Sequence, residues 1–257
     1  MSDWIWALII GFVLDLLLGD PAWLYHPVCL IGKYIGWMEK KLRRRGGNLR
    51  KSAVFLTAST VLLTVAVVAL ILMLCGLLGR IPLLIAMALL DWMGIAITSM
   101  AKEARGVEKA LGQGVTAGRT QVARIVGRDT QELSEEEIIK ATVETVSENT
   151  TDGVISPLLY AAIGGPILLW GFKAASTLDS MVGYLDEKYR DIGWSSARLD
   201  DVLNYIPARL TALLMVIASY LIGLDGKNAF RIVHRDHANH KSPNCAWSES
   251  AAAGALH

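Results

Sequence analysis

The sequence is short of charge and of the motifs that mark soluble enzymes. Of its 257 residues only 19% are charged, against roughly 25% in soluble domains, and the net charge of +1 gives no indication of nucleic-acid binding. Cys29, Cys75 and Cys245 lie far apart without a CxxC pair, which argues against a disulfide framework or a zinc site. GxxxxGK[ST], GxGxxG, HExxH and GxSxG motifs are absent. Any nucleotide must therefore bind by a less common arrangement.

Hydrophobic residues make up 53% of the chain, the mean hydropathy is +0.40, and the apolar residues come in blocks. This pattern predicts an all-α, polytopic integral membrane protein with about four to five membrane helices. The N-terminus has no basic region or cleavage site of a signal peptide, so we expect its first apolar segment to be retained. The expected membrane segments are Trp4–Leu18, Ala53–Leu78, Ile81–Met100, Val154–Phe172 and Val202–Leu224.

The loop from Glu39 to Lys51 is rich in Lys and Arg, an excess that marks the cytoplasmic side. With this loop inside, the polar stretch 101–153 is expected to be a cytoplasmic helical insert between the third and fourth membrane helices of a single membrane-embedded domain, 1–257. The segment Val154–Phe172 is broken by Pro157 and by a Gly-Gly-Pro triplet. Residues 173–201 lie outside if that segment spans the membrane, and inside if it is re-entrant.

The stretch SENTTDGVISPLLY, residues 147–160, places a polar cluster directly before an apolar segment. Such groups are unfavourable beside hydrocarbon unless they face water, protein or a ligand, so this stretch is the first candidate for chemistry. It follows a helix predicted from Glu135 to about Asn149, which a capping box of Ser134 and Glu137 begins.

Lys140, Glu144 and Glu148 are spaced four apart on that helix. One interpretation is an exposed ladder of ion pairs. The other is that Glu144, Glu148 and Asp152 present carboxylates to one Mg²⁺, which favours a few carboxylates together with substrate phosphates. For Glu144 the ion pair is the preferred interpretation, whereas Glu148 and Asp152 stand at the helix exit.

Further polar residues recur at the edges of the apolar segments. Asp91 is followed on one helical line by Thr98, Lys102 and Arg105, a stripe that suits either an anionic ligand or hydrogen-bonded packing of Asp91. Arg119, Arg124 and Arg128 in GRTQVARIVGRDT form either a phosphate clamp or a solvated basic face. Arg209 is interpreted as snorkelling, and Asp200 or Asp201 as a helix cap. The spacing of His234, His237 and His240 is poor for one metal ion.

The chain resembles the adenosylcobinamide-phosphate synthase family of cobalamin biosynthesis (CobD/CbiB). The matching stretches are DLLLGDPAWLYHPVCLIGKYIGWME, VGRDTQELSEEEIIKATVETVSENTTDGVISPLLY, KAASTLDSMVGYLDEKY, ARLDDVLNYIPARLTAL and HKSPNCAWSESAAAGAL. Lys241 and Ser248 stand where the family usually has Pro. Family members also run on for several tens of residues past this chain's end, so we expect either a short member or a truncated one.

The resemblance implies an acid–amine ligase of the cell membrane that uses Mg²⁺ and ATP. It would join a corrinoid, adenosylcobyric acid, to aminopropanol phosphate or a related amino alcohol. The catalytic candidates are Glu148, Asp152 and Lys102, of which Glu148 and Asp152 are also the candidate Mg²⁺ ligands. The candidates for binding substrate or phosphate are Arg124, Arg128, Asn149, Thr151, Asp179, Asp201 and Asn204.

Two other functions are compatible with parts of the sequence. A non-enzymatic membrane sensor, of the distantly similar type that signals β-lactamase induction, is the main alternative. A transporter that uses Asp15 and Asp91 as ion sites would show two related halves, and no such repeat is found. The expected partners are the lipid bilayer and the substrates, with no nucleic acid. Association with a second copy of the chain, or with other enzymes of the pathway, is a further expectation.

Overall fold

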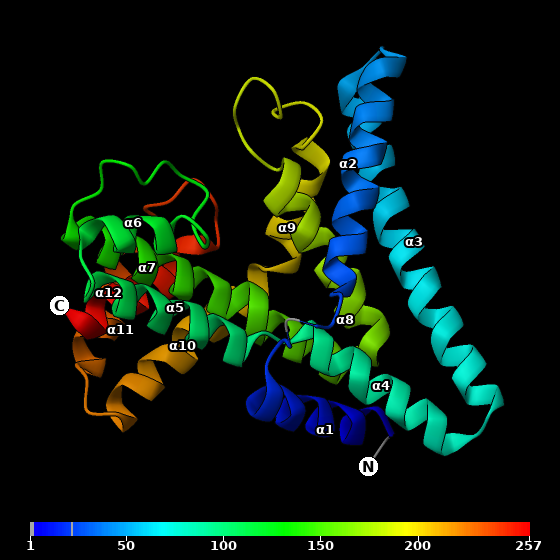
Figure 1. The fold of residues 1–257 in the computed structure, drawn as a ribbon, viewed down its shortest axis with the longest axis horizontal. Helices are drawn as coiled ribbons and strands as arrows, with labels where there is room; N and C mark the ends of the chain where they lie inside the picture. The colour runs from blue at the N-terminus through cyan, green and yellow to red at the C-terminus, as the bar shows by residue number, and fades with distance from the viewer. Residues whose placement is uncertain (1–2, 22) are drawn as a thin grey trace. The chain divides into compact units, whose positions relative to one another are not determined.

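The computed structural model describes residues 3–21 and 23–257, and these ranges contain helices and connecting loops without a strand (Figure 1). The all-α class predicted from the sequence is therefore confirmed. The chain divides into two compact units, the first formed by Met1–Ile95 and Ser156–Asn204, the second by Ala96–Ile155 and Tyr205–His257. Whether both belong to one membrane-embedded domain stays a prediction.

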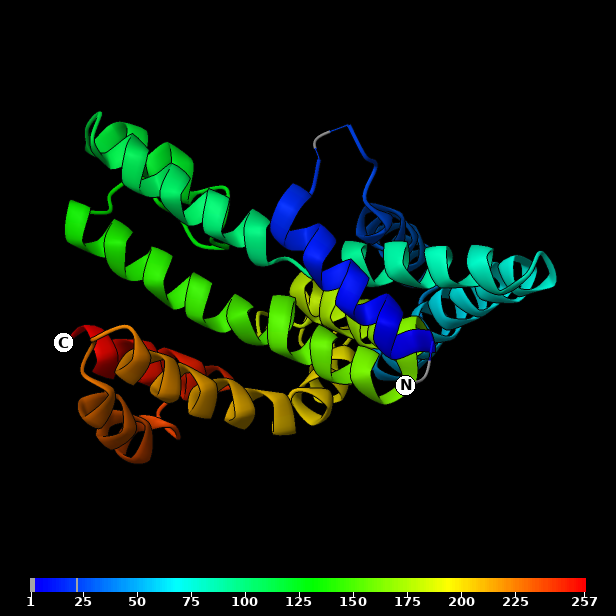
Figure 2. The ribbon, with the colours of Figure 1, turned by 90° about the horizontal axis from the view of Figure 1, so that it is seen from below.

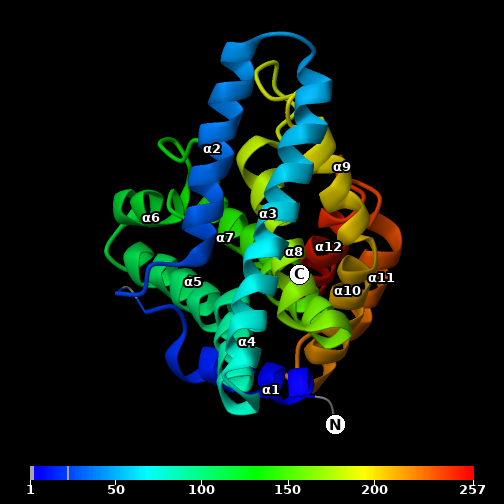
Figure 3. The ribbon, with the colours of Figure 1, turned by 90° about the vertical axis from the view of Figure 1, so that its right-hand side faces the viewer.

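Unit 1 holds the most apolar helices of the chain. Within it α1 packs on α4, and α3 packs on α2, α4 and α8. Figure 3 shows α2 and α3 side by side. The helices are α1 (Asp3–Leu18), α2 (Pro27–Arg45), α3 (Leu49–Leu77), α4 (Arg80–Gly94), α8 (Ser156–Val182) and α9 (Trp194–Leu203).

Unit 2 contains the polar insert and the C-terminal part of the chain. Helices α7, α12 and α10 lie side by side in Figure 2, with α11 packed on α10 and α12. The elements are α5 (Ile97–Leu111), α6 (Val115–Val122), α7 (Glu135–Thr150), a π-helical turn η1 (Thr151–Ile155), α10 (Tyr205–Leu221), α11 (Gly226–Asp236) and α12 (Cys245–Leu256).

Among the described residues, three helical stretches are long and apolar enough to cross a membrane, or four if the bent pair α9–α10 is one span. The three are Leu49–Leu77, Arg80–Leu111 and Glu135–Val182. The chain is thus a polytopic membrane protein, and its three or four candidate spans among the described residues differ little from the about four to five expected. The difference includes α1, whose 16 residues extend about 24 Å, less than the roughly 30 Å of the hydrocarbon core.

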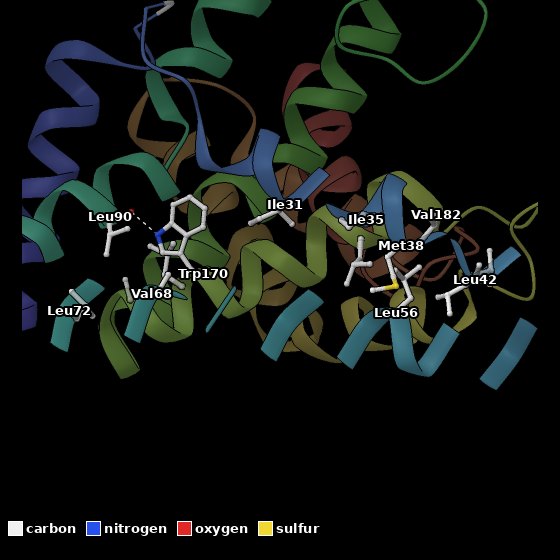
Figure 4. Packing of buried hydrophobic residues seen from close by; sticks show 14 residues of the cluster. Ile31, Ile35, Met38, Leu42, Leu56, Val68, Leu72, Leu90, Trp170 and Val182 are labelled. Carbon is white, nitrogen blue, oxygen red and sulfur yellow. Dashed lines mark hydrogen bonds between the residues drawn. The ribbon is translucent and has the colours of Figure 1, made fainter. Parts of the chain in front are cut away.

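Most of the apolar side chains of α3 are exposed on the protein surface, as expected of a helix in contact with lipid. Only 17% of its most apolar 18-residue window is buried inside the protein, so the remaining side chains have to meet an apolar solvent. The buried remainder of α3 contributes Leu56, Val68 and Leu72 to the core of unit 1. In the same core the Trp170 indole N–H donates to the backbone oxygen of Leu90 at 3.0 Å (Figure 4).

The break expected inside the fourth apolar segment is present in α8. Gly164 and Gly165 leave the helical conformation, and Gly165 has φ +64°, a value that glycine adopts without strain. After this break α8 ends at Val182 and leads into the loop 183–193. Arg43, in the basic stretch 39–51, donates to the backbone oxygen of Lys188 at 2.6 Å, and Arg50 donates to Asp191 at 3.1 Å.

Those two contacts place the loop 183–193 beside the basic stretch, and a hydrogen bond cannot reach across a hydrocarbon core of about 30 Å. Of the two topologies left open by the sequence, the contacts favour the re-entrant one. We expect a single cysteine at Glu187, in a protein whose own cysteines are replaced by Ser, to react with an impermeant maleimide from the same side as one at Arg45. Labelling of the two positions from opposite sides would contradict this placement.

Candidate functional site

The SENTTDG stretch adopts an unusual backbone in the structure. The capping box of Ser134 and Glu137 starts α7 as predicted, and α7 continues to Thr150. The next five residues then form η1, and π-helical turns are rare and are found frequently at functional sites. The backbone oxygen of Gly153 in this turn accepts a hydrogen bond from the backbone N–H of Ala96, at 3.0 Å. This contact ties the turn to the residue that precedes α5.

Four carboxyl groups interact around this turn. Three come from α7 and η1, and the fourth comes from α12. The Cys245 thiol donates to Oε1 of Glu148 at 3.2 Å, and the half-buried Asp152 is close enough to act on the same thiol. Glu249, one turn further along α12, interacts electrostatically with Glu148 and Glu144. We call Glu144, Glu148, Asp152 and Glu249 the acidic cluster.

Two side chains of α12, Cys245 and the cluster member Glu249, have raised pKa values. Burial, reinforced by the charges of Glu148 and Asp152, raises the pKa of the Cys245 thiol far above its usual range. The raised pKa favours the protonated thiol, which donates its hydrogen bond to Glu148. Burial also raises the pKa of the Glu249 carboxyl, with Glu148 and Glu144 adding to the effect and His240 and Arg128 opposing it.

The carboxylates of Glu148 and Asp152 suit a cation whose other ligands come from the substrate. Among the described residues no group of three His, Cys, Asp or Glu side chains is arranged to hold a metal ion. Mg²⁺ is commonly bound by one or two carboxylates plus substrate phosphates, a requirement that Glu148 and Asp152 fit. Beside them the hydroxyl of Thr151 is buried and has no hydrogen-bond partner in the described part of the chain.

The predicted phosphate-binding arginines are paired with acids. Arg124 binds Glu103 at 3.1 Å and Arg128 binds Glu144 at 2.5 Å, and both arginine side chains are more than half exposed. The ion pair expected for Glu144 is therefore present, but with Arg128. The ladder with Lys140 is wrong, because Lys140 pairs with Glu136.

The polar stripe expected from Asp91 to Arg105 is interrupted. The chain leaves the helical conformation at Ile95 and Ala96, so Asp91 belongs to α4 and Lys102 to α5. Asp91 is fully buried as expected, but neither of its carboxylate oxygens has a hydrogen-bond partner among the described residues. Lys102 is exposed on α5, and Asn149 is exposed near the end of α7.

The remaining candidates lie in unit 1. Asn204 is buried and uses both ends of its amide, accepting from Ser156 at 2.6 Å and donating to Asp200 at 3.0 Å. This network gives Asn204 a structural role, and substrate binding by Asn204 stays a prediction. Asp201 forms a long contact of 3.8 Å with Arg198, and Asp179 lies near the end of α8.

Two residues that interact with the candidate site were given no such role in the sequence. The sequence gives Cys245 no partner cysteine and indicates no role for Glu249. Both lie in HKSPNCAWSES, a stretch that the resemblance marked without indicating which side chains meet α7. Composition and spacing carry no signal for that contact, since Cys245 and Glu148 are 97 residues apart.

Comparison with known proteins identifies the family. The sequence model of the CobD/CbiB protein family matches residues 8–257. The chain belongs to the CobD/CbiB family. The cobalamin biosynthesis protein CobD of Pelobacter propionicus is 51% identical to it over 251 residues, which cover 97% of this chain and 78% of that protein. No solved structure matches the chain.

Other CobD/CbiB relatives give the same result. CobD of Listeria monocytogenes serovar 1/2a is 48% identical over 96% of this chain and 79% of its own length. CbiB of Salmonella arizonae is 44% identical, again over 96% of this chain and 79% of its own length. The resemblance seen in the sequence is confirmed, and it places the chain among proteins of cobalamin biosynthesis.

Proposed function

We propose that the protein is an ATP-dependent acid–amine ligase of the cell membrane. In this proposal it joins the free carboxyl group of adenosylcobyric acid to the amine of aminopropanol phosphate, or of a related amino alcohol, and yields adenosylcobinamide phosphate. Membership of the CobD/CbiB family supports the pathway. The observation that carries the site is a pair of carboxylates, Glu148 in the last turn of α7 and Asp152 in the π-helical turn, which both interact with Cys245.

The reaction needs activation because a carboxylate is a poor electrophile. Its negative charge disfavours attack, and oxide is not a leaving group. Transfer of the γ-phosphoryl group of ATP to the carboxylate gives an acyl phosphate and ADP. The neutral amine then attacks the carbonyl carbon, inorganic phosphate departs, and the amine releases a proton as the amide forms. The protein's part is positioning, charge stabilisation and acceptance of the proton.

The acidic cluster can serve this sequence in two ways. Glu148 and Asp152 attract the cationic end of the amino alcohol, and a carboxylate there can accept the proton that the amine loses. The same two residues would hold Mg²⁺, which neutralises polyphosphate charge when bound. The Cys245 thiol fixes the orientation of Glu148 in either role.

The other predicted residues keep secondary roles in the proposal. Lys102, Arg124 and Arg128 would contact phosphate once substrate charge competes with the weak surface pairs to Glu103 and Glu144. Thr151 and Asn149 would contribute polar contacts at the turn. Asp179 and Asp201 stay predictions, and so does association with a second copy or with other enzymes of the pathway.

The direct test is an assay with the detergent-solubilised chain, adenosylcobyric acid, Mg·ATP and aminopropanol phosphate. We expect an amide product together with one ADP per amide. Omission of ATP should abolish the product, and addition of EDTA should reduce it. Binding of a ligand without turnover would favour the sensor alternative. Absence of both product and binding of all three substrates would refute the ligase.

A further inference from the structure

Arg209, at the start of α10, is held in place by aromatic rings. Its guanidinium carbon lies 3.5 Å from the ring centroid of Tyr205 and 4.8 Å from that of Trp247. Its Nη1 donates to the backbone oxygen of Tyr205 at 2.6 Å and to Oδ1 of Asn244 at 3.2 Å. These contacts fix the planar group without neutralising it. A fixed guanidinium loses less freedom when it binds an anion.

The charge of Arg209 is uncompensated in the described part of the chain. The ion pairs there involve other basic groups, and no carboxylate lies within 4.0 Å of Arg209. Arg124 and Arg128, by contrast, are each bound to an acid. A half-buried arginine that is oriented but unpaired is the better candidate to receive an anion.

The position of Arg209 relates it to the acidic cluster through two adjacent residues. Asn244 binds Arg209, and the next residue, Cys245, binds Glu148. Consecutive Cα atoms are about 3.8 Å apart, so a cationic group and a carboxylate flank the same short segment at the start of α12. This arrangement is complementary to a small zwitterion that carries an amine at one end and an anion at the other.

We infer that Arg209 binds the phosphate group of the amine substrate, while Glu148 and Asp152 bind its ammonium group. The inference rests on the proposed function and assigns the phosphate end of that substrate to a residue outside the predicted set. A snorkelling Arg209, with Tyr205 and Trp247 at the membrane interface, would instead bind the phosphate of a lipid headgroup. The two cases differ in which ligand the residue recognises.

The test compares the binding of aminopropanol phosphate with that of aminopropanol, by calorimetry on the full chain in detergent. A charge-assisted hydrogen bond contributes enough that R209Q should bind the phosphorylated amine about ten- to a hundredfold more weakly. Its binding of aminopropanol should equal that of the wild type. Arg209→Lys keeps the charge but loses the planar fork, so we expect an intermediate loss. Arg231→Gln is the matched control, because it removes an exposed arginine that, within the described ranges, is bonded only to Asn228.

Each outcome decides between defined alternatives. Unchanged binding of aminopropanol phosphate by R209Q, or a loss confined to ATP, overturns the inference and leaves the ligase intact. A loss of phosphatidylglycerol binding in vesicles, with aminopropanol phosphate unaffected, assigns Arg209 to lipid and also overturns it. Failure of the wild type to bind aminopropanol phosphate removes the proposed function along with the inference. If R209Q unfolds at a lower temperature than the wild type, the binding of aminopropanol phosphate by Arg209→Lys decides between the alternatives.

Discussion

Asp152→Asn is expected to lower the rate of amide formation by about 10²–10⁴-fold, the range typical of removing a positioned acid–base group. Asn has nearly the same shape as Asp but carries no charge and accepts no proton at neutral pH. The half-buried position of Asp152 in η1, beside Cys245, makes its charge effective on a bound amine or cation. The measurement is single-turnover formation of the amide in detergent, with circular dichroism to verify the helical fold.

The matched control is Asp129→Asn. Asp129 lies in the same unit, is exposed, and uses its carboxylate to accept a hydrogen bond from the backbone N–H of Gln131 at 3.0 Å, which Asn can still accept. We expect this variant to turn over like the wild type. If Asp152→Asn does the same, Asp152 has no part in the chemistry and the acidic cluster loses its central member.

Gly11→Ala is expected to destabilise unit 1 by about 1–3 kcal/mol, the usual range for overpacking an interior. A Cβ on Gly11 would lie 2.8 Å from the backbone nitrogen of Trp92 and 2.9 Å from the backbone oxygen of Ala88. These are backbone atoms of α4, so only a separation of α1 from α4 can relieve the clash. Small residues that allow such close approach are characteristic of helix contacts in membranes.

Gly36→Ala makes the same chemical change where there is room. No atom lies within 4 Å of a Cβ built on Gly36, in the middle of α2, and Ala favours a helix interior over Gly by about 1 kcal/mol. Thermal unfolding in detergent should therefore shift downward for Gly11→Ala and upward or not at all for Gly36→Ala. Equal shifts in both variants would mean that α1 and α4 are not packed through Gly11.

The parts of this fold that follow local rules could be predicted from the sequence. The charge-free run Ala53–Leu78 corresponds to α3, and the capping box at Ser134 begins α7 where expected, because both signals are contained in a few neighbouring residues. The break at Gly164 and Gly165 is equally local. The sequence predicts no break at Ile95 and Ala96, because an isolated glycine such as Gly94 is tolerated inside a helical pattern.

The candidate site could be predicted only in part. SENTTDG was recognised as polar residues in an unfavourable place, a property of the segment itself. Its partners depend on which helix packs against α7, and no pattern in the sequence states that α12 does so. The same limit applies to Arg209. Its spacing gives it no partner, whereas Arg124 and Arg128 lie close together in one polar segment. The surroundings of Arg209 come from Tyr205 and from the distant Asn244 and Trp247.

The burial of the Cys245 thiol has a consequence for its sensitivity to oxidants. Oxidants and alkylating agents attack the thiolate, and burial beside two carboxylates raises the pKa of this thiol, which disfavours that form. The cysteine therefore offers Glu148 a hydrogen bond without adding a redox-sensitive position next to the acidic cluster.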